Sequence, residues 1–264
     1  MTEQEKQERL MYEIIGRISD INAPIVFKGA LITKLILREN GYTDMERPTN
    51  DIDANWIGEP PAMDELADLI NRSVKPQNGV YAESERSYAP GKSAGIRFID
   101  NESGVKLFTM DISIKPVFGD RVYHYGEATI RGVLPDTVLC DKISVLSGER
   151  IFRRFKDVLD VYALAHCLDI RITDIYYALE RNERVLGTFD AFLTRRADLE
   201  HAYGKMRGVI GMPDFNSVYV YLEKFLVPFI THDRNPKIWL GDEMSWRDVR
   251  ERKIQKKRTD RETR

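Results

Sequence analysis

Hydrophobic residues near the start of the chain recur with two periods, that of a helix and that of a strand. Five apolar residues have the spacing of one helix face (Leu10, Met11, Ile14, Ile15 and Ile18). Thr2 and Glu5 stand ahead of them at the spacing of a capping box, which predicts where this helix begins. The apolar run 24–27 then predicts a strand, and the apolar stretch 31–37 predicts a second helix.

Extended patterns dominate the chain from residue 51 to residue 131. Strands are predicted at five places, which turn residues separate (51–57, 80–88, 94–100, 105–115 and 121–131). One amphipathic helix interrupts them at 63–73. We therefore expect a mixed sheet flanked by helices, which belongs to the α/β (α+β) class.

Strand patterns largely disappear after Pro135. Asp136 is a suitable N-cap for a helix over 137–147, and helical spacing recurs in four later segments (151–167, 173–182, 188–203 and 214–230). We expect an α/β domain over 1–134, a helical domain over 135–246 and a basic C-terminal tail over 247–264.

The overall composition is that of an ordinary globular protein, with 264 residues, 42% hydrophobic and 31% charged. No apolar run approaches the roughly 20 residues of a membrane-spanning helix, and residues 1–10 lack the apolar core of a secretory signal. We predict a soluble, cytoplasmic protein that does not bind membranes. Cys140 and Cys167 have no metal-site spacing, so we expect free thiols in a reducing compartment.

Basic charge is concentrated at the C-terminal end. Residues 247–264 hold nine Lys or Arg against four Asp or Glu, although the whole chain has a formal net charge of −2. Such a segment can follow a phosphate backbone. It contains no aromatic residue for base stacking, so a solvated helix end is the alternative interpretation.

Asp51 and Asp53 are the first residues with a chemical implication. Side chains alternate between the faces of a strand, so both carboxylates share one face while Ile52 points into the core. Mg²⁺ is usually bound by one or two carboxylates together with substrate phosphates. An isolated Asp-x-Asp pair is more often an Asx turn or a solvated strand edge, so the pair alone decides nothing.

A third aspartate, Asp111, falls on the polar face of another predicted strand. Over 105–115 the even positions 108–114 are apolar, whereas Thr109, Asp111 and Ser113 share the opposite face. If this strand neighbours that of the acidic pair, three carboxylates meet, which suits two metal ions about 3.5–4 Å apart in phosphoryl chemistry. A solvent-facing strand residue is the alternative interpretation.

Lys28, Gly29 and Ala30 stand where a predicted strand turns into a helix. The first N–H groups of a helix are unpaired and form the positive end of its dipole, which suits a triphosphate. Gly29 permits close backbone approach or a left-handed conformation. Lys28 either contributes a positive charge there or is simply solvated.

Three segments in this order, FKGALITKL, RPTNDID and LFTMDIS, resemble the minimal nucleotidyltransferase superfamily, which shares a glycine turn, a DxD strand and a third strand aspartate. Together with the later segments LPDTVLCDKISVL and RRFKDVLDVYAL, they resemble more narrowly the AbiEii/AbiGii toxin group, which includes MenT-like toxins. The resemblance covers roughly residues 20–167, and the linked order of the motifs is more specific than any one of them.

The resemblance implies roles for particular residues. It places catalysis on four side chains, of which the aspartates are also metal ligands (Asp51, Asp53, Asp111 and Lys142). It places nucleotide binding on the turn and on further motif positions (Lys28, Gly29, Ala30, Arg47, Thr49, Lys156, Asp157 and Asp160). Lys156 and Asp160 are four residues apart on a helix, so a weak surface ion pair is the alternative interpretation for them.

The resemblance further implies a Mg²⁺-dependent nucleotidyltransferase with two ions, which transfers NMP from an NTP to an acceptor hydroxyl. The implied acceptor is tRNA or another RNA, and the implied role is that of a toxin in a toxin–antitoxin or phage-defence pair, with a cognate antitoxin as partner. One position departs from the family: Ala30 stands where Gly or Ser is usual and offers a phosphate no hydroxyl.

Two alternatives stay open. The first keeps the chemistry but changes the acceptor to a small hydroxylated molecule or a protein side chain. The second, which Ala30 makes conceivable, is a nucleotide-binding module without turnover. A Ser/His hydrolase is disfavoured, because the four histidines have no G-x-S-x-G partner and form no H-E-x-x-H pattern.

Overall fold

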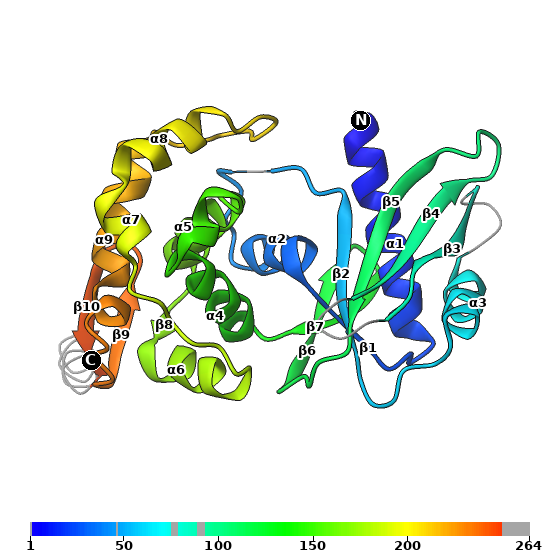
Figure 1. Ribbon diagram of the computed structural model, residues 1–264, viewed down its shortest axis with the longest axis horizontal. Coiled ribbons are helices and arrows are strands. Elements are labelled where there is room, and N and C mark those ends of the chain that lie inside the picture. The colour runs from blue at the N-terminus through cyan, green and yellow to red at the C-terminus, as the bar shows by residue number, and fades with distance from the viewer. Residues whose placement is uncertain (1, 46, 75–78, 89–92, 250–264) are drawn as a thin grey trace, which may run out of the picture. The chain divides into compact units, whose positions relative to one another are not determined.

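The computed structural model describes residues 2–45, 47–74, 79–88 and 93–249 (Figure 1). The predicted basic tail lies outside these residues from residue 250 onward. The chain divides into two compact units, one formed by Met1–Ile36 and Pro48–Leu134, the other by Leu37–Arg47 and Pro135–Arg264. The second unit thus includes Leu37–Arg47, a stretch that the sequence pattern assigns to the first domain.

A seven-stranded mixed sheet of order β3-β4-β5-β2-β1-β7-β6 forms the centre of the first unit. Its strands are β1 (Ile25–Lys28), β2 (Asp51–Trp56), β3 (Val80–Arg86), β4 (Ala94–Asp100), β5 (Lys106–Ser113), β6 (Asp120–Tyr125) and β7 (Ala128–Val133). Strand β2 is parallel to β5 and antiparallel to β1, which is parallel to β7. The segment 121–131, predicted as one strand, is a hairpin of β6 and β7, because the chain reverses at Gly126 with a φ of 56°.

Three helices belong to the α/β part of the chain: α1 (Glu3–Asp20), α2 (Gly29–Glu39) and α3 (Met63–Ser73). The predicted capping box of α1 is present, since Thr2 Oγ1 accepts from the Glu5 N–H and the Glu5 carboxylate accepts from the Thr2 N–H. Helix α1 packs against β7 and α3 against β3. The predicted mixed sheet flanked by helices is therefore confirmed.

The two faces of the central strands differ in polarity, as the alternation of their residues predicts. On β2, Ile52 and Ala54 are fully buried while Asp51 is exposed, and on β5, Met110 and Ile112 are fully buried. Burying one apolar face fixes the register, because a slip by one residue would expose every apolar side chain. The aspartates therefore occupy the other, polar face.

The second unit is mainly helical, as expected. Its helices are α4 (Pro135–Leu146), a 3₁₀ turn (Glu149–Phe152), α5 (Lys156–Cys167), α6 (Ile172–Arg181), α7 (Asp190–Thr194), α8 (Arg196–Gly204) and α9 (Phe215–Ile230). Helix α4 begins at Pro135, a residue favoured at a first helical position, so Asp136 lies in the first turn and is not the N-cap. Two segments predicted as single helices, 151–167 and 188–203, are each broken in two.

A small antiparallel sheet in the second unit has no counterpart in the sequence prediction. It joins β8 (Ile170–Arg171), β9 (Lys237–Leu240) and β10 (Ser245–Asp248). Strands this short carry too few alternating positions to be recognised.

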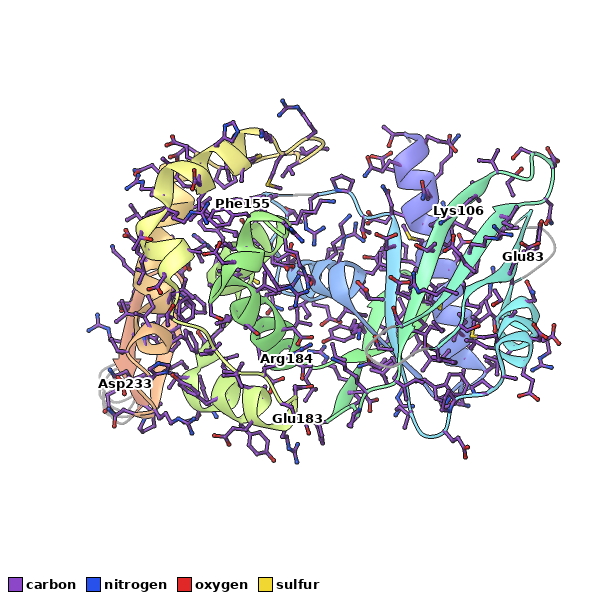
Figure 2. All side chains as sticks on the ribbon, viewed as in Figure 1. Glu83, Lys106, Phe155, Glu183, Arg184 and Asp233 are labelled. Atoms are coloured by element: carbon purple, nitrogen blue, oxygen red, sulfur yellow. The ribbon has the colours of Figure 1, made fainter. Side chains whose placement is uncertain are left out.

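Aromatic residues fill the core of the second unit. Trp239 is fully buried and donates to Ala165 O at 2.9 Å. Phe155, which is labelled in Figure 2, packs edge-on against Tyr203. His166 stacks on Tyr221 with 3.8 Å between ring centroids.

The two cysteines are free, as expected; Cys140 is buried and Cys167 half-buried. Burial raises the pKa of the Cys167 thiol to about 11. None of the helices in the described part of the chain has both the length and the apolarity to span a bilayer.

Candidate active site

The three candidate metal-binding aspartates lie on adjacent strands of the first unit. Asp53 on β2 stands directly beside Asp111 on β5, and Asp51 stands beside Thr109 in the same parallel pair. Residues that face each other across a ladder share one face of the sheet, so the three carboxylates are presented together. The three carboxylates were expected to meet only if their strands were adjacent, and the structure meets that condition.

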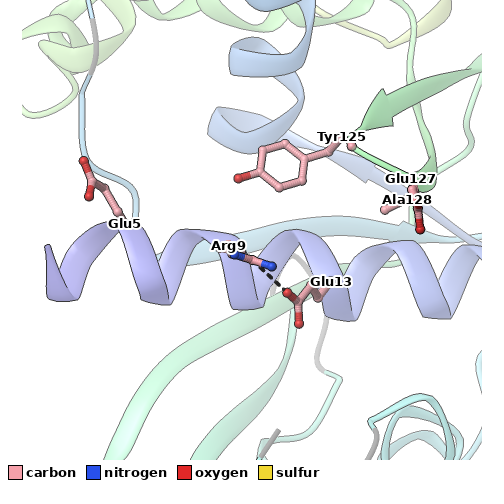
Figure 3. A pocket seen from close by; sticks show the side chains of 7 residues that line it. Glu5, Arg9, Glu13, Tyr125, Glu127 and Ala128 are labelled. Atoms are coloured by element: carbon pink, nitrogen blue, oxygen red, sulfur yellow. Dashed lines mark hydrogen bonds and ion pairs between the residues drawn. The ribbon is translucent and has the colours of Figure 1, made fainter. Parts of the chain in front are cut away.

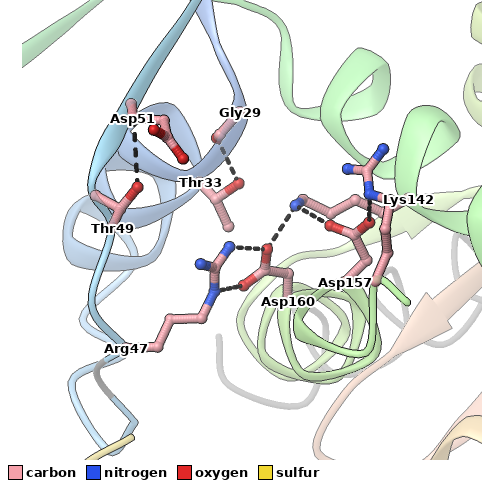
Figure 4. Close-up of polar contacts among 9 residues, drawn as sticks. Gly29, Thr33, Arg47, Thr49, Asp51, Lys142, Asp157 and Asp160 are labelled. Carbon is pink, nitrogen blue, oxygen red and sulfur yellow. Dashed lines mark hydrogen bonds and ion pairs between the residues drawn. The ribbon is translucent and has the colours of Figure 1, made fainter. Parts of the chain in front are cut away.

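Gly29 brings the start of α2 against this acidic group. Its φ is +70°, and a Cβ added there would lie 2.1 Å from Asp53 Oδ2. Only glycine therefore fits, for both the left-handed conformation and the close approach of Asp53. Thr33, one helical turn later, donates from Oγ1 to Gly29 O at 2.9 Å and holds the turn (Figure 4). Ala30 follows in the first turn, where the helix leaves N–H groups unpaired.

Lys28 is hydrogen-bonded, so the interpretation of a merely solvated lysine is wrong. Its Nζ donates to Asn55 Oδ1 at 2.5 Å and to Ser113 Oγ at 3.3 Å. Lys28 faces Asp53 in the β1–β2 ladder, and Asn55 and Ser113 occupy the next positions of the polar face. Its positive charge is thus fixed beside the acidic pair.

Two threonines contact Asp51, the most exposed of the three aspartates. Thr109 Oγ1 donates to Asp51 Oδ1 at 2.9 Å. The buried Thr49 places its Oγ1 3.4 Å from Asp51 O, as Figure 4 shows. Sequence reasoning placed Thr109 on the polar face but gave it no role. The alternation of residues in β5 was the signal that could have paired it with Asp51.

Arg86 is the neighbour that the sequence analysis missed. Its Nη2 lies 2.6 Å from Asp111 Oδ1, and the two side chains are 44% and 41% exposed. The three carboxylates offer the oxygen donors that Mg²⁺ takes, and their shared face suits such an ion. As placed, however, no three His, Cys, Asp or Glu side chains among the described residues converge closely enough to hold a metal ion. In addition, Oδ1 of Asp111 accepts a hydrogen bond from Arg86.

The remaining predicted residues form a buried ion network within the second unit. Lys142 Nζ lies 2.5 Å from Asp160 Oδ2 and 3.0 Å from Asp157 Oδ1 (Figure 4). Arg47 binds both oxygens of Asp160 at 2.6 and 2.7 Å, and Arg154 Nε lies 2.8 Å from Asp157 Oδ2. A bidentate guanidinium and a lysine thus neutralise two carboxylates that water does not reach.

The network keeps its charges despite burial. Burial alone would raise the pKa of Asp160, but Lys142 and Arg47 outweigh it and hold that pKa well below its usual range. Burial would likewise lower the pKa of Lys142, and the charges of Asp160 and Asp157 outweigh it in the opposite direction. Lys156 is exposed and does not pair with Asp160, so the interpretation of a surface ion pair is wrong.

A separate pocket of about 680 Å³ lies between α1 and the β6–β7 hairpin (Figure 3). Three glutamates and one arginine are among the residues that line it (Glu5, Arg9, Glu13, Tyr125, Gly126, Glu127 and Ala128). Arg9 Nε pairs with Glu13 Oε1 at 3.1 Å, and Tyr125 stacks on Tyr12. None of the predicted site residues lines this pocket.

A mixed sheet that presents three carboxylates beside a glycine turn at the start of a helix is the arrangement of the nucleotidyltransferase class. The sequence matches the family described as nucleotidyl transferase AbiEii toxin, Type IV TA system, over residues 10–216. The chain belongs to this family and is a nucleotidyltransferase enzyme of the toxin–antitoxin type. The predicted family resemblance is therefore confirmed.

One solved structure agrees in fold. MenT4, a nucleotidyltransferase toxin from Mycobacterium tuberculosis H37Rv, superposes with a TM-score of 0.52 at 13% identity, covering 85% of this chain and 82% of that chain. An antigenic nucleotidyltransferase-like protein from Paracoccidioides brasiliensis gives a TM-score of 0.44 at 12% identity, over 75% of this chain and 92% of that chain. No significant match was found among curated protein sequences.

Proposed function

We propose that this enzyme transfers NMP from an NTP to an acceptor hydroxyl in a Mg²⁺-dependent reaction that releases pyrophosphate. The observation that carries the proposal is the placement of Asp51, Asp53 and Asp111 on one face of adjacent strands, with the Gly29 turn against Asp53. In this reaction the acceptor oxygen forms a bond to the α-phosphorus, the bond to the pyrophosphate breaks, and the hydroxyl proton is lost.

The carboxylates and the helix start have complementary tasks. Asp51 and Asp53 would hold one ion, and Asp111 would complete the site of a second. When bound, Mg²⁺ supplies charge neutralisation on the phosphates and lowers the pKa of the acceptor hydroxyl. The N–H groups at Gly29 and Ala30 would receive phosphate oxygens, a contact that needs no hydroxyl at residue 30.

The second unit offers fewer candidates for nucleotide contact than the sequence suggests. Lys142, Asp157 and Asp160 are 5% exposed or less and neutralise one another, and Arg47 is bound to Asp160. We expect them to stabilise the unit, and their contact with nucleotide remains a prediction. Lys156 is exposed and, within the described residues, free of ion pairs, so it retains a charge for a phosphate.

An RNA acceptor, tRNA in particular, is our proposal for the target. Membership of a Type IV toxin–antitoxin family supports a macromolecular target and a cognate antitoxin. The positive balance of residues 247–264 is compatible with a phosphate backbone. A small hydroxylated molecule or a protein side chain is the alternative acceptor, and a cytoplasmic location remains a prediction.

The test is incubation of the full-length protein with Mg²⁺, total cellular RNA and each α-labelled NTP in turn, beside a D51A/D53A variant. The proposal predicts label in a discrete RNA band, lost with EDTA and with the variant. Label on protein or on small molecules would show that NMP transfer takes place but that the acceptor is not RNA. Absence of any labelled product with all four nucleotides would contradict NMP transfer.

A further inference from the structure

We propose that Arg86 occupies Oδ1 of Asp111 and competes with a divalent ion for this third carboxylate. This inference rests on the proposed function, because it concerns the same three aspartates. It assigns to Arg86 the role of a positioning residue that sets the affinity of the site for its second ion.

The sheet places Arg86 in one transverse row with the carboxylates. Arg86 on β3 faces Gly95 on β4, Gly95 faces Asp111 on β5, and Asp111 faces Asp53 on β2. Neighbouring strands are about 4.8 Å apart, so Arg86 reaches across a whole strand to touch Asp111. Gly95 leaves room for this path: a Cβ there would already touch Cβ and Nη2 of Arg86 at 3.4 Å, so a side chain larger than that of alanine would obstruct it.

The guanidinium is held in this position from a second side. Arg86 Nε donates to Ser93 O at 2.9 Å, and Nη2 lies 3.2 Å from Ser93 Oγ. Three contacts thus fix a planar group whose Nη2 lies on the carboxylate. The geometry is therefore more specific than that of a long side chain meeting a charge by chance at the surface.

The Arg86–Asp111 pair is exposed enough for a divalent cation to replace the guanidinium. Both side chains are about two-fifths accessible, and ion pairs at this exposure are weak because water screens them. A divalent cation carries twice the charge of a guanidinium and can bind the aspartates together. The pair therefore lowers the affinity for the ion without abolishing its binding.

A second arginine on the same face provides a matched control. Arg97 on β4 faces Thr109 in the ladder, and its Nη2 lies 2.7 Å from Glu83 Oε2 on β3. The Arg97–Glu83 pair is 43% and 38% exposed, close to the values for Arg86 and Asp111. Neutralising either arginine removes one positive charge from this face, but only Arg86 contacts a candidate metal ligand.

The experiment measures binding of Mn²⁺ alone to the full-length protein by calorimetry, without nucleotide, in wild type, R86Q, R97Q, D111N and R86Q/D111N. We expect R86Q to tighten Mn²⁺ binding by threefold or more. R97Q should change the affinity by less than about 1.5-fold. The gain from R86Q should vanish in the D111N background. Equal effects of R86Q and R97Q, weaker binding by R86Q, or a gain that persists with D111N would overturn the inference.

The outcome separates this inference from the proposed function. If R86Q binds Mn²⁺ as wild type does while the wild-type enzyme transfers labelled NMP, then only the role of Arg86 is wrong. If neither wild type nor R86Q binds Mn²⁺ and no labelled product forms, then both the metal site and the inference fail.

Discussion

Replacing Gly29 by alanine tests the contact between the helix start and the acidic strand. Two costs follow from the structure. Alanine at a φ of +70° costs about 1–2 kcal/mol in backbone strain. Its Cβ would also lie 2.1 Å from Oδ2 and 2.8 Å from Cγ of Asp53, so the carboxylate must move, at about 1–3 kcal/mol by analogy with overpacked cores.

A second glycine separates the two costs. Gly104, in the turn between β4 and β5, has a φ of +67° and nothing within 4 Å of an added Cβ. G104A should therefore destabilise by about 1–2 kcal/mol, the backbone cost alone, and keep wild-type activity. G29A should destabilise by about 2–5 kcal/mol and lose at least tenfold in NMP transfer, because Asp53 is displaced.

The assay is urea unfolding of both variants, with labelled NMP transfer measured on the folded proteins. In a D53A background, where Oδ2 and Cγ are absent but Cβ still lies 2.9 Å from the added Cβ, the added cost of G29A should fall and stay above that of G104A. Equal stability losses for G29A and G104A, with full activity in G29A, would refute the reasoning that Gly29 and Asp53 form one site.

Three further predictions concern other parts of the molecule. Lys142→Met removes a positive partner from the buried carboxylates of Asp157 and Asp160 and should lower the free energy of unfolding in urea by about 3–5 kcal/mol. As a control, Lys106→Met breaks an exposed pair with Glu85 and should lower it by about 1 kcal/mol or less. Burial lowers the pKa of His166 below 6.5, so the unfolded chain binds a proton at this residue more readily than the folded protein does. The contribution of neutral His166 to stability is therefore present above pH 6.5 and lost as pH falls below that value. In thermal melts between pH 7.5 and 5, the His166→Phe variant should lack this part of the acid destabilisation. Gly95→Val should obstruct the path of Arg86 and tighten Mn²⁺ binding as R86Q does, and a folded Gly95→Val protein with wild-type affinity would contradict this.

Local alternation was sufficient to predict the acidic face. The alternation of Asp51, Ile52 and Asp53 indicates which side of the strand is buried. The same alternation around Asp111 indicates the polar face of the second strand. The turn at Gly29 could also be predicted from the sequence, because a strand that leads directly into a helix needs a residue that tolerates a positive φ.

Contacts that depend on strand order could not be predicted. Arg86 and Asp111 are 25 residues apart, and they meet only because β3, β4 and β5 are consecutive neighbours and Gly95 leaves the path open. The bond between Arg47 and Asp160 spans 113 residues and joins a loop to a helix. The small sheet of the second unit was missed because its strands are short and because β8 pairs with a strand more than 60 residues away.

The most direct test of the account is the rate of NMP transfer in the single variants D51N, D53N and D111N, with D100N as the control. Asp100 ends β4 and caps a surface turn through Ser103, so its neutralisation leaves the polar face intact. We predict a loss of about 100-fold or more in each of the three variants, comparable to the removal of a single transition-state contact, and wild-type rates in D100N. Near wild-type transfer by any one of the three, in a folded protein, would contradict a single active site built from these carboxylates.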